Sequence, residues 1–461
     1  MTSCISNKYH PATKLLLLII FTFNAVVLMA QNVSINKPVP TKAQAAWQQM
    51  DFYLFMHFGP NTFTNLEWGK GTEEEDIFNP TNLDCGQWCR TAIAAGAKGI
   101  IITAKHHDGF CLWPSKYSTH TVAQSKWRNG KGDVLRELSD SCKKYGLKMG
   151  VYLSPWDRNH PKYGTPEYND VFINMMKEVV SNYGPFFEFW WDGANGEGPN
   201  GKKQIYDWHK FEQTMQTIAP NTVVFSDIGP GARWVGNEKG YAGDPNWNTL
   251  DTTGMYRGSD APNVTTHLNH GDENGNVWLP AECDVSIRPG WFYHKEQDDS
   301  VKTPQELFDL YLKSVGRGAN LLLNVPPDRK GLIDAHDSIA LVGFKNLRDA
   351  SFDKAIADKK FTAASSLYKI DLHQSKKINC IVLKEDIATG QKIKSFTIQF
   401  MLNNKMVSEL NGKTVGKKRI LTFAAVNTDS FTIKIYEAKA TPLLNEVAAY
   451  LIDESLVEKP N

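Results

Sequence analysis

The sequence lacks excess charge, and beyond its first thirty residues it lacks any long apolar run. A net charge of +1 over 461 residues gives no bulk attraction to nucleic acid or to a membrane surface, so we expect neutral partners. No segment after residue 30 approaches the roughly 20 apolar residues that cross a bilayer. Internal repeats and low-complexity segments are also missing. What remains is a globular chain, 41% apolar, that is long enough to bury a large core.

The seven cysteines form no regular pattern. Cys4 lies close to the N-terminus, and no pair among the other six has the CxxC spacing of a zinc site. These six are Cys85, Cys89, Cys111, Cys142, Cys283 and Cys380. We therefore expect buried free thiols rather than a disulfide framework, and the sequence indicates neither a metal nor a cofactor.

Residues 1–30 have the organisation of a secretory signal peptide. Lys8 and Lys14 precede the apolar run 15–21, and Ala30 offers a cleavage point. The mature protein is then expected to be soluble and either periplasmic or secreted. A permanent N-terminal anchor is the alternative, because apolar residues continue almost to the cleavage point.

Short apolar segments alternate with amphipathic segments over residues 31–350. The apolar segments are 51–59, 99–106, 148–155, 188–193, 222–227, 277–282 and 320–326, and the amphipathic ones include 86–95, 134–145, 170–183 and 304–315. This α/β alternation predicts a parallel sheet closed into a (β/α)₈ TIM-like barrel, in which one of the eight strands is missing or irregular. Residues 229–276, rich in Gly, Asn, Asp and Trp, are expected to form long loops on the face where such barrels hold their active sites.

The pattern changes in residues 351–461. Brief apolar segments separated by Lys, Asn and Gly turns occur at 378–383, 395–401, 419–423, 430–435 and 447–452, with no helical periodicity between them. They predict a small C-terminal β-sandwich domain. It has fewer clustered aromatic residues than the barrel, so we favour a structural role over glycan binding.

The run 186–193, Phe-Phe-Glu-Phe-Trp-Trp-Asp-Gly, ends in a carboxylate followed by a glycine. A buried parallel strand delivers such a side chain to the mouth of a barrel, where Asp192 could act as a nucleophile and Gly193 could let substrate approach. Asp192 could instead cap the helix that follows. Residues 189–191 form an aromatic wall that would exclude water, and we include Trp191 among the predicted substrate-binding residues.

Polar and aromatic side chains collect at or just after the ends of other predicted strands. They are His57, Glu67, Trp68, His106, His107 and Tyr152. A single histidine at such a position is usually structural, but successive strand ends of a barrel converge on one rim. Imidazoles and a carboxylate can hydrogen-bond sugar hydroxyls while an indole stacks on the apolar face of the ring.

Six motifs occur in one order along the barrel: MHFG at 56–59, EW at 67–68, KHHDGF at 105–110, WWDG at 190–193, RWVGNE at 233–238 and PAECDVSIRPGWFY at 280–293. Together they resemble the α-L-fucosidases of glycoside hydrolase family 29. The resemblance implies a retaining exo-hydrolase that acts on fucosylated glycans, with Asp192 as nucleophile and the strand-end residues as the fucose pocket. The last two motifs resemble the subgroup that releases α-1,3/1,4-linked fucose from branched, galactose-containing oligosaccharides.

A retaining glycosidase needs a second carboxyl as acid and base, and two glutamates are candidates. Glu238 lies in a loop where nearby Trp234 could keep it protonated, and we favour it. Glu282 ends a predicted strand close to Arg288, whose charge would lower the pKa of a carboxyl beside it. Arg288 either contacts substrate or holds Glu282 in place, and we favour the second role.

Two other classes of function are compatible with parts of the pattern. A metal-dependent barrel hydrolase could use His57, His106, His107 and Asp192 as ligands, although adjacent histidines on a strand point to opposite faces. A non-catalytic fucose-binding protein is expected to lack one of the paired carboxylates, and both are present. Resistance of the activity to chelators separates the first from a two-carboxylate enzyme, and release of fucose separates the second.

Overall fold

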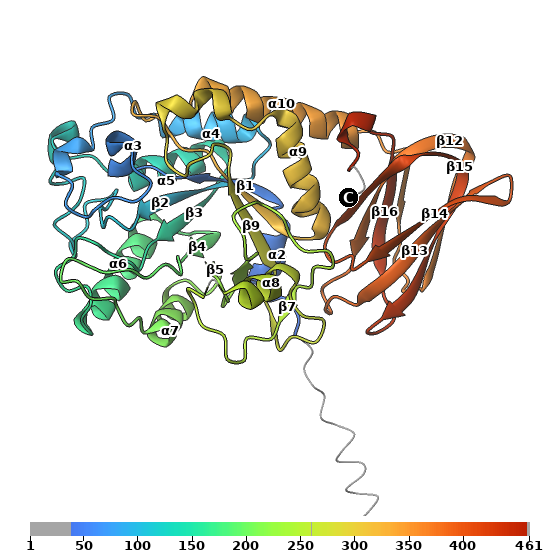
Figure 1. The fold of residues 1–461 in the computed structure, drawn as a ribbon, viewed down its shortest axis with the longest axis horizontal. Helices are drawn as coiled ribbons and strands as arrows, with labels where there is room; N and C mark the ends of the chain where they lie inside the picture. The colour runs from blue at the N-terminus through green and yellow to red at the C-terminus, as the bar shows by residue number, and fades with distance from the viewer. Residues whose placement is uncertain (1–37, 260, 459–461) are drawn as a thin grey trace, which may run out of the picture. The chain divides into compact units, whose positions relative to one another are not determined.

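The computed structural model describes residues 38–259 and 261–458, and eight parallel strands in it close into a barrel (Figure 1). The strands follow one another around the barrel in the order β1, β10, β9, β6, β5, β4, β3 and β2. Their bounds are β1 (Phe52–Met56), β2 (Gly99–Lys105), β3 (Lys148–Leu153), β4 (Glu188–Trp190), β5 (Val223–Ser226), β6 (Ala232–Trp234), β9 (Ala281–Ser286) and β10 (Asn320–Asn324). The predicted TIM-like barrel is thereby confirmed. The predicted leader, residues 1–30, lies outside the described residues.

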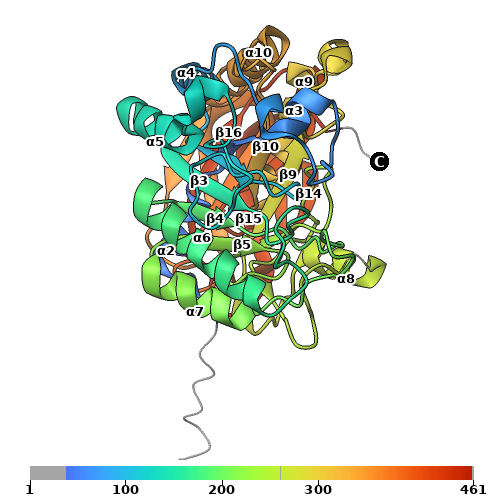
Figure 2. The same cartoon turned by 90° about the vertical axis from the view of Figure 1, so that its left-hand side faces the viewer.

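Helices surround the strands, as Figure 2 shows for α4, α5, α6 and α7. The helices are α2 (Lys42–Gln48), α3 (Pro60–Thr64), α4 (Cys85–Ala94), α5 (Val134–Tyr145), α6 (Glu167–Tyr183), α7 (Trp208–Ile218), α8 (Pro262–His270), α9 (Pro304–Lys313) and α10 (Ala335–Phe352). Local sequence explains their starts. In α9, for example, Pro304 occupies the first turn while Thr303 and Glu306 form a reciprocal capping box. No helix in the described part of the chain is long and apolar enough to cross a membrane.

Two features of the barrel differ from the sequence prediction. The eighth strand, β6, has three residues and follows β5 after a short turn without an intervening helix, which left no periodic signal. The predicted strand 277–282 is wrong: Val277–Trp278 forms β8, which pairs antiparallel with β7 (Thr249–Leu250) outside the barrel. Pro280 has no N–H for a strand ladder, and the barrel strand begins only at the next residue.

Burial along the strands explains why they read as continuous apolar runs. Every residue of β1, β2, β4, β5, β9 and β10 is buried, as expected for parallel strands enclosed by helices. The short helix α2 packs at the start of these strands. Its Trp47 donates from Nε1 to Glu188 at 2.7 Å and accepts from Asn320 at 2.9 Å. The end of the barrel where the strands begin is therefore tied to α2.

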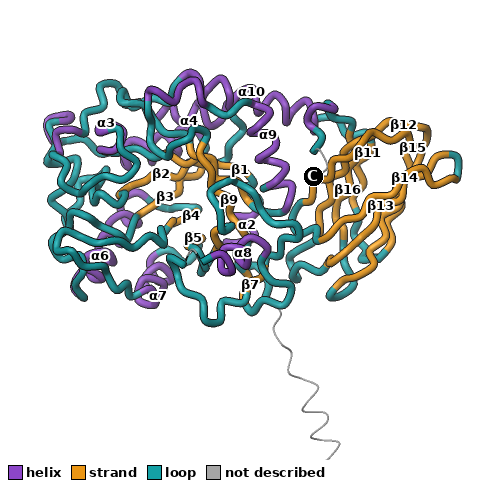
Figure 3. The backbone as a smooth tube through the Cα atoms, viewed as in Figure 1, coloured by secondary structure: helices purple, strands orange, loops and turns teal. Residues whose placement is uncertain are grey.

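The chain after α10 forms a six-stranded antiparallel sheet, and Figure 3 shows it as strand joined by loops. In sheet order the strands are β11 (Ala357–Lys360), β16 (Leu444–Tyr450), β12 (Leu367–Glu385), β15 (Arg419–Ala438), β13 (Ile393–Leu402) and β14 (Lys405–Lys413). The pairing of the long strands β12 and β15 shifts register near its middle. Apolar residues from both halves of the sheet share one buried cluster, so the sheet folds over into two layers around it.

Polar contacts join this sheet to the start of the barrel strands. Lys417 is buried and donates to the carbonyl of Gln48 at 2.6 Å and to Asp51 at 2.9 Å. Two further pairs connect the sheet with the barrel loop 244–248: Arg419 bonds Asp244, and Gln391 accepts from Asn248. The sheet therefore braces the end of the barrel opposite to the carboxyl ends of its strands.

Candidate active site

A cavity of about 130 Å³ lies at the carboxyl ends of the barrel strands. Its lining includes eight of the residues predicted from the sequence: His57, Glu67, Trp68, His106, His107, Tyr152, Asp192 and Glu238. Phe55, Trp190, Ala194, Asp284 and Trp291 complete it. A second cavity of about 280 Å³ adjoins the first and shares Asp192 and Glu238 with it. The convergence of strand ends expected from the sequence is thus observed.

Asp192 follows β4 and faces the cavity. Its Oδ2 accepts a hydrogen bond from the Tyr152 hydroxyl at 2.9 Å, its Oδ1 accepts from the Ala194 amide at 2.8 Å, and His107 Nε2 lies 3.7 Å away. The next helix, α7, is capped by Asp207 instead. Asp192 therefore caps no helix, and its two oxygens are fixed by a strand-borne phenol and its own turn.

Asp227, a second carboxylate, leaves no room for a side chain at Gly193. A Cβ added to Gly193 would lie 2.2 Å from Asp227 Oδ2, so any larger residue would push that side chain aside. Asp227 follows β5 and accepts from the Gly258 amide. Burial and the nearby Asp192 charge raise the pKa of Asp227 to about 6.

Two of the cavity histidines are neutral, and their tautomers follow from their partners. His57 Nδ1 donates to Asn324 Oδ1 at 2.8 Å, since the amide nitrogen of Asn324 already donates to Ser286. His107 Nδ1 donates to Ser154 Oγ at 2.9 Å, since that hydroxyl donates onward to a carbonyl. Burial lowers the pKa of His57 to about 3 and that of His107 to about 4. Both Nε2 atoms are then acceptors.

His106 is the third imidazole of the cavity, and its Nδ1 has no hydrogen-bond partner among the described residues. Burial, the first cause, and the neighbouring His107 and His57 keep its pKa well below the usual value. A buried polar atom without a partner costs free energy unless a ligand or water satisfies it. The His106 ring lines the cavity, although this nitrogen itself has almost no accessible surface.

Glu67, Trp68 and Trp291 form another part of the cavity lining. Glu67 accepts from the Trp291 amide at 2.7 Å and also pairs with His294. Trp68 is 58% exposed at the rim, where its ring meets the ring of His107 edge-on. The Glu67 carboxylate thus holds in place a second indole that the sequence analysis did not list as a site residue, although it lies in a quoted motif.

Glu238 lies in the loop after β6, and its Oε2 accepts from Trp291 Nε1 at 3.4 Å. Its pKa is raised, mainly by burial and further by the charges of Asp192 and Glu67. The expected partner was Trp234, but that indole donates to Asp284 at 2.8 Å. The pKa of Glu238 is therefore shifted in the direction expected of it, for a different structural reason.

Glu282 lies inside the barrel and lines neither of the two cavities. It accepts from Trp190 Nε1 at 2.9 Å and from the Tyr53 hydroxyl, and it adjoins Glu188. Burial and then the Glu188 charge raise its pKa well above the usual value. The expectation that Arg288 would lower this pKa is wrong, because the two side chains have no contact.

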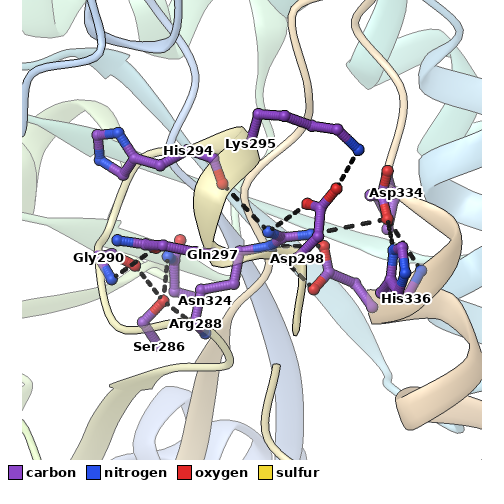
Figure 4. A network of polar contacts seen from close by, with 12 residues as sticks. Ser286, Arg288, Gly290, His294, Lys295, Gln297, Asp298, Asn324, Asp334 and His336 are labelled. Atoms are coloured by element: carbon purple, nitrogen blue, oxygen red, sulfur yellow. Dashed lines mark hydrogen bonds and ion pairs between the residues drawn. The ribbon is translucent and has the colours of Figure 1, made fainter. Parts of the chain in front are cut away.

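Arg288 is buried in a network behind the site, shown in Figure 4. Its guanidinium donates to Asp337 at 3.0 Å and to Asp298 at 2.9 Å, and lies 3.7 Å from Asp334. It lies outside both cavities, so neither predicted role, substrate contact or support of Glu282, matches its position. β9 ends at Ser286, so the alternation that turns Glu282 inward no longer applies.

One group of described residues has the geometry of a metal site: Asp298, Asp334 and His336. It belongs to the network of Figure 4, away from the cavity, and its carboxylates already pair with Arg288 and Lys295. We interpret it as an ion-pair cluster. The histidines and Asp192 of the alternative metal reading form no such group within the described chain.

Trp191 does not reach the cavity. Its side chain is fully buried on the outside of the barrel against Trp208 and Phe211. Trp190, its neighbour, lines the cavity and stacks on Phe225 at 4.1 Å. Side chains alternate along a strand, so the residue two before Asp192 shares its face and the adjacent one does not. If this alternation had been applied to Asp192, Trp190 rather than Trp191 would have been predicted to line the cavity.

Comparisons with known proteins agree with this geometry. The family model described as alpha-L-fucosidase matches residues 29–344. Alpha-L-fucosidase 1 of Arabidopsis thaliana is 38% identical over 451 residues, covering 90% of this chain and 88% of the plant protein. A glycoside hydrolase 29 family member from an unknown rumen bacterium is 40% identical with a TM-score of 0.85, covering 91% of this chain and 78% of the other. A glycoside hydrolase 29 fucosidase of Ruminococcus gnavus, solved in complex with fucose, is 29% identical with a TM-score of 0.81, covering 92% and 96%. This chain belongs to the α-L-fucosidases of glycoside hydrolase family 29, enzymes that hydrolyse fucosides.

Proposed function

We propose that this enzyme releases terminal fucose by a retaining, double-displacement mechanism in which Asp192 is the nucleophile and Glu238 the acid and base. One observation carries the proposal: among the four carboxyl groups that line the cavity, Asp192 and Glu238 lie in opposite environments. Asp192 receives hydrogen bonds on both oxygens, which suits a carboxylate, while burial and neighbouring charges raise the pKa of Glu238.

In the first step Asp192 attacks the anomeric carbon while Glu238 gives its proton to the departing glycosidic oxygen. The fucose is then covalently bound to Asp192 and the leaving sugar has gained a hydroxyl. In the second step Glu238, now ionised, takes a proton from water, and that water displaces Asp192 from the sugar. Both carboxyls return to their starting forms.

The remaining cavity residues suit recognition of one small deoxy-sugar. The Nε2 atoms of His57 and His107 can accept hydrogen bonds from hydroxyls, and the His106 ring lines the same cavity. Trp190 and Trp291 supply apolar faces for the ring and its methyl group. The relative from Ruminococcus gnavus that was solved with fucose supports fucose as the bound sugar.

We also propose that the preferred substrates carry α-1,3- or α-1,4-linked fucose on branched, galactose-containing glycans, and that the protein meets them after export. The adjoining cavity of about 280 Å³ supports a bulky leaving group. Incubation with α-1,2-, α-1,3-, α-1,4- and α-1,6-fucosylated oligosaccharides, followed by product identification, tests the linkage. Release of fucose from the α-1,2- or α-1,6-linked substrates as fast as from the α-1,3- and α-1,4-linked ones contradicts the proposed linkage preference.

Azide rescue of two variants tests the residue roles. Asp192→Gly should lose about 10³-fold or more of kcat, and azide should restore part of it by forming the inverted β-fucosyl azide. Glu238→Gly should keep activity on a substrate with an activated leaving group, and azide should then give the retained α-fucosyl azide, because it attacks the fucosyl-Asp192 intermediate.

Glu282→Gly is the matched control, since it removes the other candidate acid from a position outside the cavity. It should give no azide product of either configuration. Near-normal turnover by Asp192→Gly, or an α-azide from Glu282→Gly rather than from Glu238→Gly, contradicts the assignment.

A further inference from the structure

The second cavity is bounded by carboxyl groups on two walls. One wall carries Asp192, Gly193 and Asp227 after β4 and β5, and the other carries Glu238 and Asp284. It begins where the fucose cavity ends, between the proposed nucleophile and the proposed acid. A sugar leaving the anomeric carbon after protonation by Glu238 would lie in this space.

No lysine, arginine or histidine occurs among the described residues that line this cavity. The nearest cation in the loop above Asp227 is Arg257, which does not line it. Its guanidinium pairs with Glu212 and donates to Ser226 and to the Gly229 carbonyl. The Arg257 guanidinium is therefore engaged by these partners, and every charged residue that lines the cavity is acidic.

Asp284 supplies a polar group that points to a ligand. Its side chain is 4% exposed, yet it lines both cavities. It accepts one hydrogen bond from Trp234, and no other side chain of the described residues bonds to it. A buried carboxyl usually has more than one partner, so the free oxygen of Asp284 is available to a hydroxyl group in the cavity.

We propose that this cavity holds the sugar to which fucose is attached, and that its carboxyl lining selects neutral leaving sugars and rejects those carrying sulfate or carboxylate. The inference rests on the proposed function and adds a substrate class to it. Hydroxyl groups can donate to Asp227 and Asp284, whereas an anion in the cavity is repelled by the negative charges of Asp192 and Asp227. The ring of Trp234 offers an apolar face to the same sugar.

The expected size of this discrimination follows from Coulomb's law. An anion placed within about 8 Å of two carboxylates, at the effective dielectric of a site near a protein surface, is disfavoured by tenfold or more. The charge of Asp227 accounts for part of this repulsion and can be removed with little change of shape.

The test compares three substrates with the wild-type enzyme: a fucosylated trisaccharide, the same molecule with a sulfate on the sugar attached to fucose, and the same molecule with an uncharged acetyl ester at that position. Initial rates of fucose release give kcat/KM for each. The acetylated substrate controls for size. We expect the sulfated substrate to be at least about tenfold worse than the acetylated one, and Asp227→Asn to narrow that ratio severalfold.

Asp140→Asn removes an equal charge from the exposed face of α5, outside the cavity, and should leave the ratio unchanged. Equal rates on the sulfated and acetylated substrates overturn the inference while leaving the proposed function intact, whether or not Asp227→Asn folds. The inference is also overturned if the ratio of kcat/KM on the acetylated substrate to that on the sulfated one is the same in Asp227→Asn as in Asp140→Asn. Failure to release fucose from any of the three refutes the proposed function and this inference with it.

Discussion

Two levels of the same barrel carry carboxyl groups, and only one of them meets the cavity. On the lower level Glu188 and Glu282 are fully buried, and they hydrogen-bond to Trp47, Trp190 and Tyr53. The upper level carries Asp192, Asp227, Glu238 and Asp284, which line the two cavities. The two levels share strands, because Glu188 begins β4 and Asp192 follows it, while Glu282 and Asp284 are both in β9.

Position along the strand, rather than residue type or burial, separates the carboxyls enclosed within the barrel from those that line the cavities. Burial raises the pKa of Glu188 to about 7, and burial together with the Glu188 charge raises that of Glu282 well above its usual value, which favours the protonated form in this pair. A protonated carboxyl with Tyr53 and Trp190 as fixed neighbours is a packing element. A raised pKa can serve catalysis only where substrate can reach the group, as we propose for Glu238.

The largest effect that separates the two levels is expected from matched amide substitutions. Glu238→Gln should lower kcat/KM on fucosylated oligosaccharides by about 10²- to 10⁴-fold, because the amide cannot transfer a proton. Glu282→Gln should lower kcat/KM by less than about tenfold, since an amide of the same shape replaces a carboxyl that lies outside both cavities and whose raised pKa favours its neutral form. Initial rates of fucose release measure both.

For stability, measured by thermal unfolding, we expect the opposite order: substitution of Glu282 should matter more than substitution of Glu238. Glu282→Ala should lower the free energy of unfolding by about 2–4 kcal/mol, because it leaves Trp190 and Tyr53 without their acceptor and opens a void. Glu238→Ala, at the cavity wall, should change it little. If Glu282→Gln abolished turnover while Glu238→Gln did not, the assignment of the two levels would be reversed.

Sequence reasoning could predict the barrel because its signals are strong: buried parallel strands are continuous apolar runs, and the helices between them are amphipathic. It missed β6, whose three residues are too few for any periodicity. It also extended one strand across Pro280 and so merged part of a small hairpin with β9.

The site could be predicted where a strand end determined a side chain's position, as at His57, His106 and Asp192. The site could not be predicted where it depended on a residue's level along the barrel axis or on the direction of its side chain. Glu282 and Glu238 differ in their level in the barrel, which chain spacing does not encode. The network of Arg288 depends on α10 and the loop after β9, elements that meet it only in the folded chain.

Substitutions of the adjacent residues Trp190 and Trp191 should have smaller effects, one on activity and the other on stability. Trp190→Phe removes the indole that bonds Glu282 and faces the cavity, so kcat/KM should fall by about tenfold. Trp191→Phe removes part of a ring packed against α7, so stability should fall by about 1–3 kcal/mol with kcat/KM almost unchanged. Rates and melting temperatures of both variants measure this. Loss of activity without loss of stability in Trp191→Phe contradicts the placement.

The smallest effect concerns the pH profile. Glu238 must be protonated for the first step, so kcat/KM should fall as pH rises through its raised pKa. The Trp291 indole donates to Glu238 and favours its ionised form. Trp291→Phe should therefore raise that pKa further and move the alkaline limb upward by a few tenths of a pH unit. Trp68→Phe is the matched control, because it removes another indole at the rim that does not bond Glu238. A downward shift in Trp291→Phe, or an equal shift in both variants, would mean that a group other than Glu238 sets the limb, and the reactive level of the barrel would then have to be assigned to a different carboxyl.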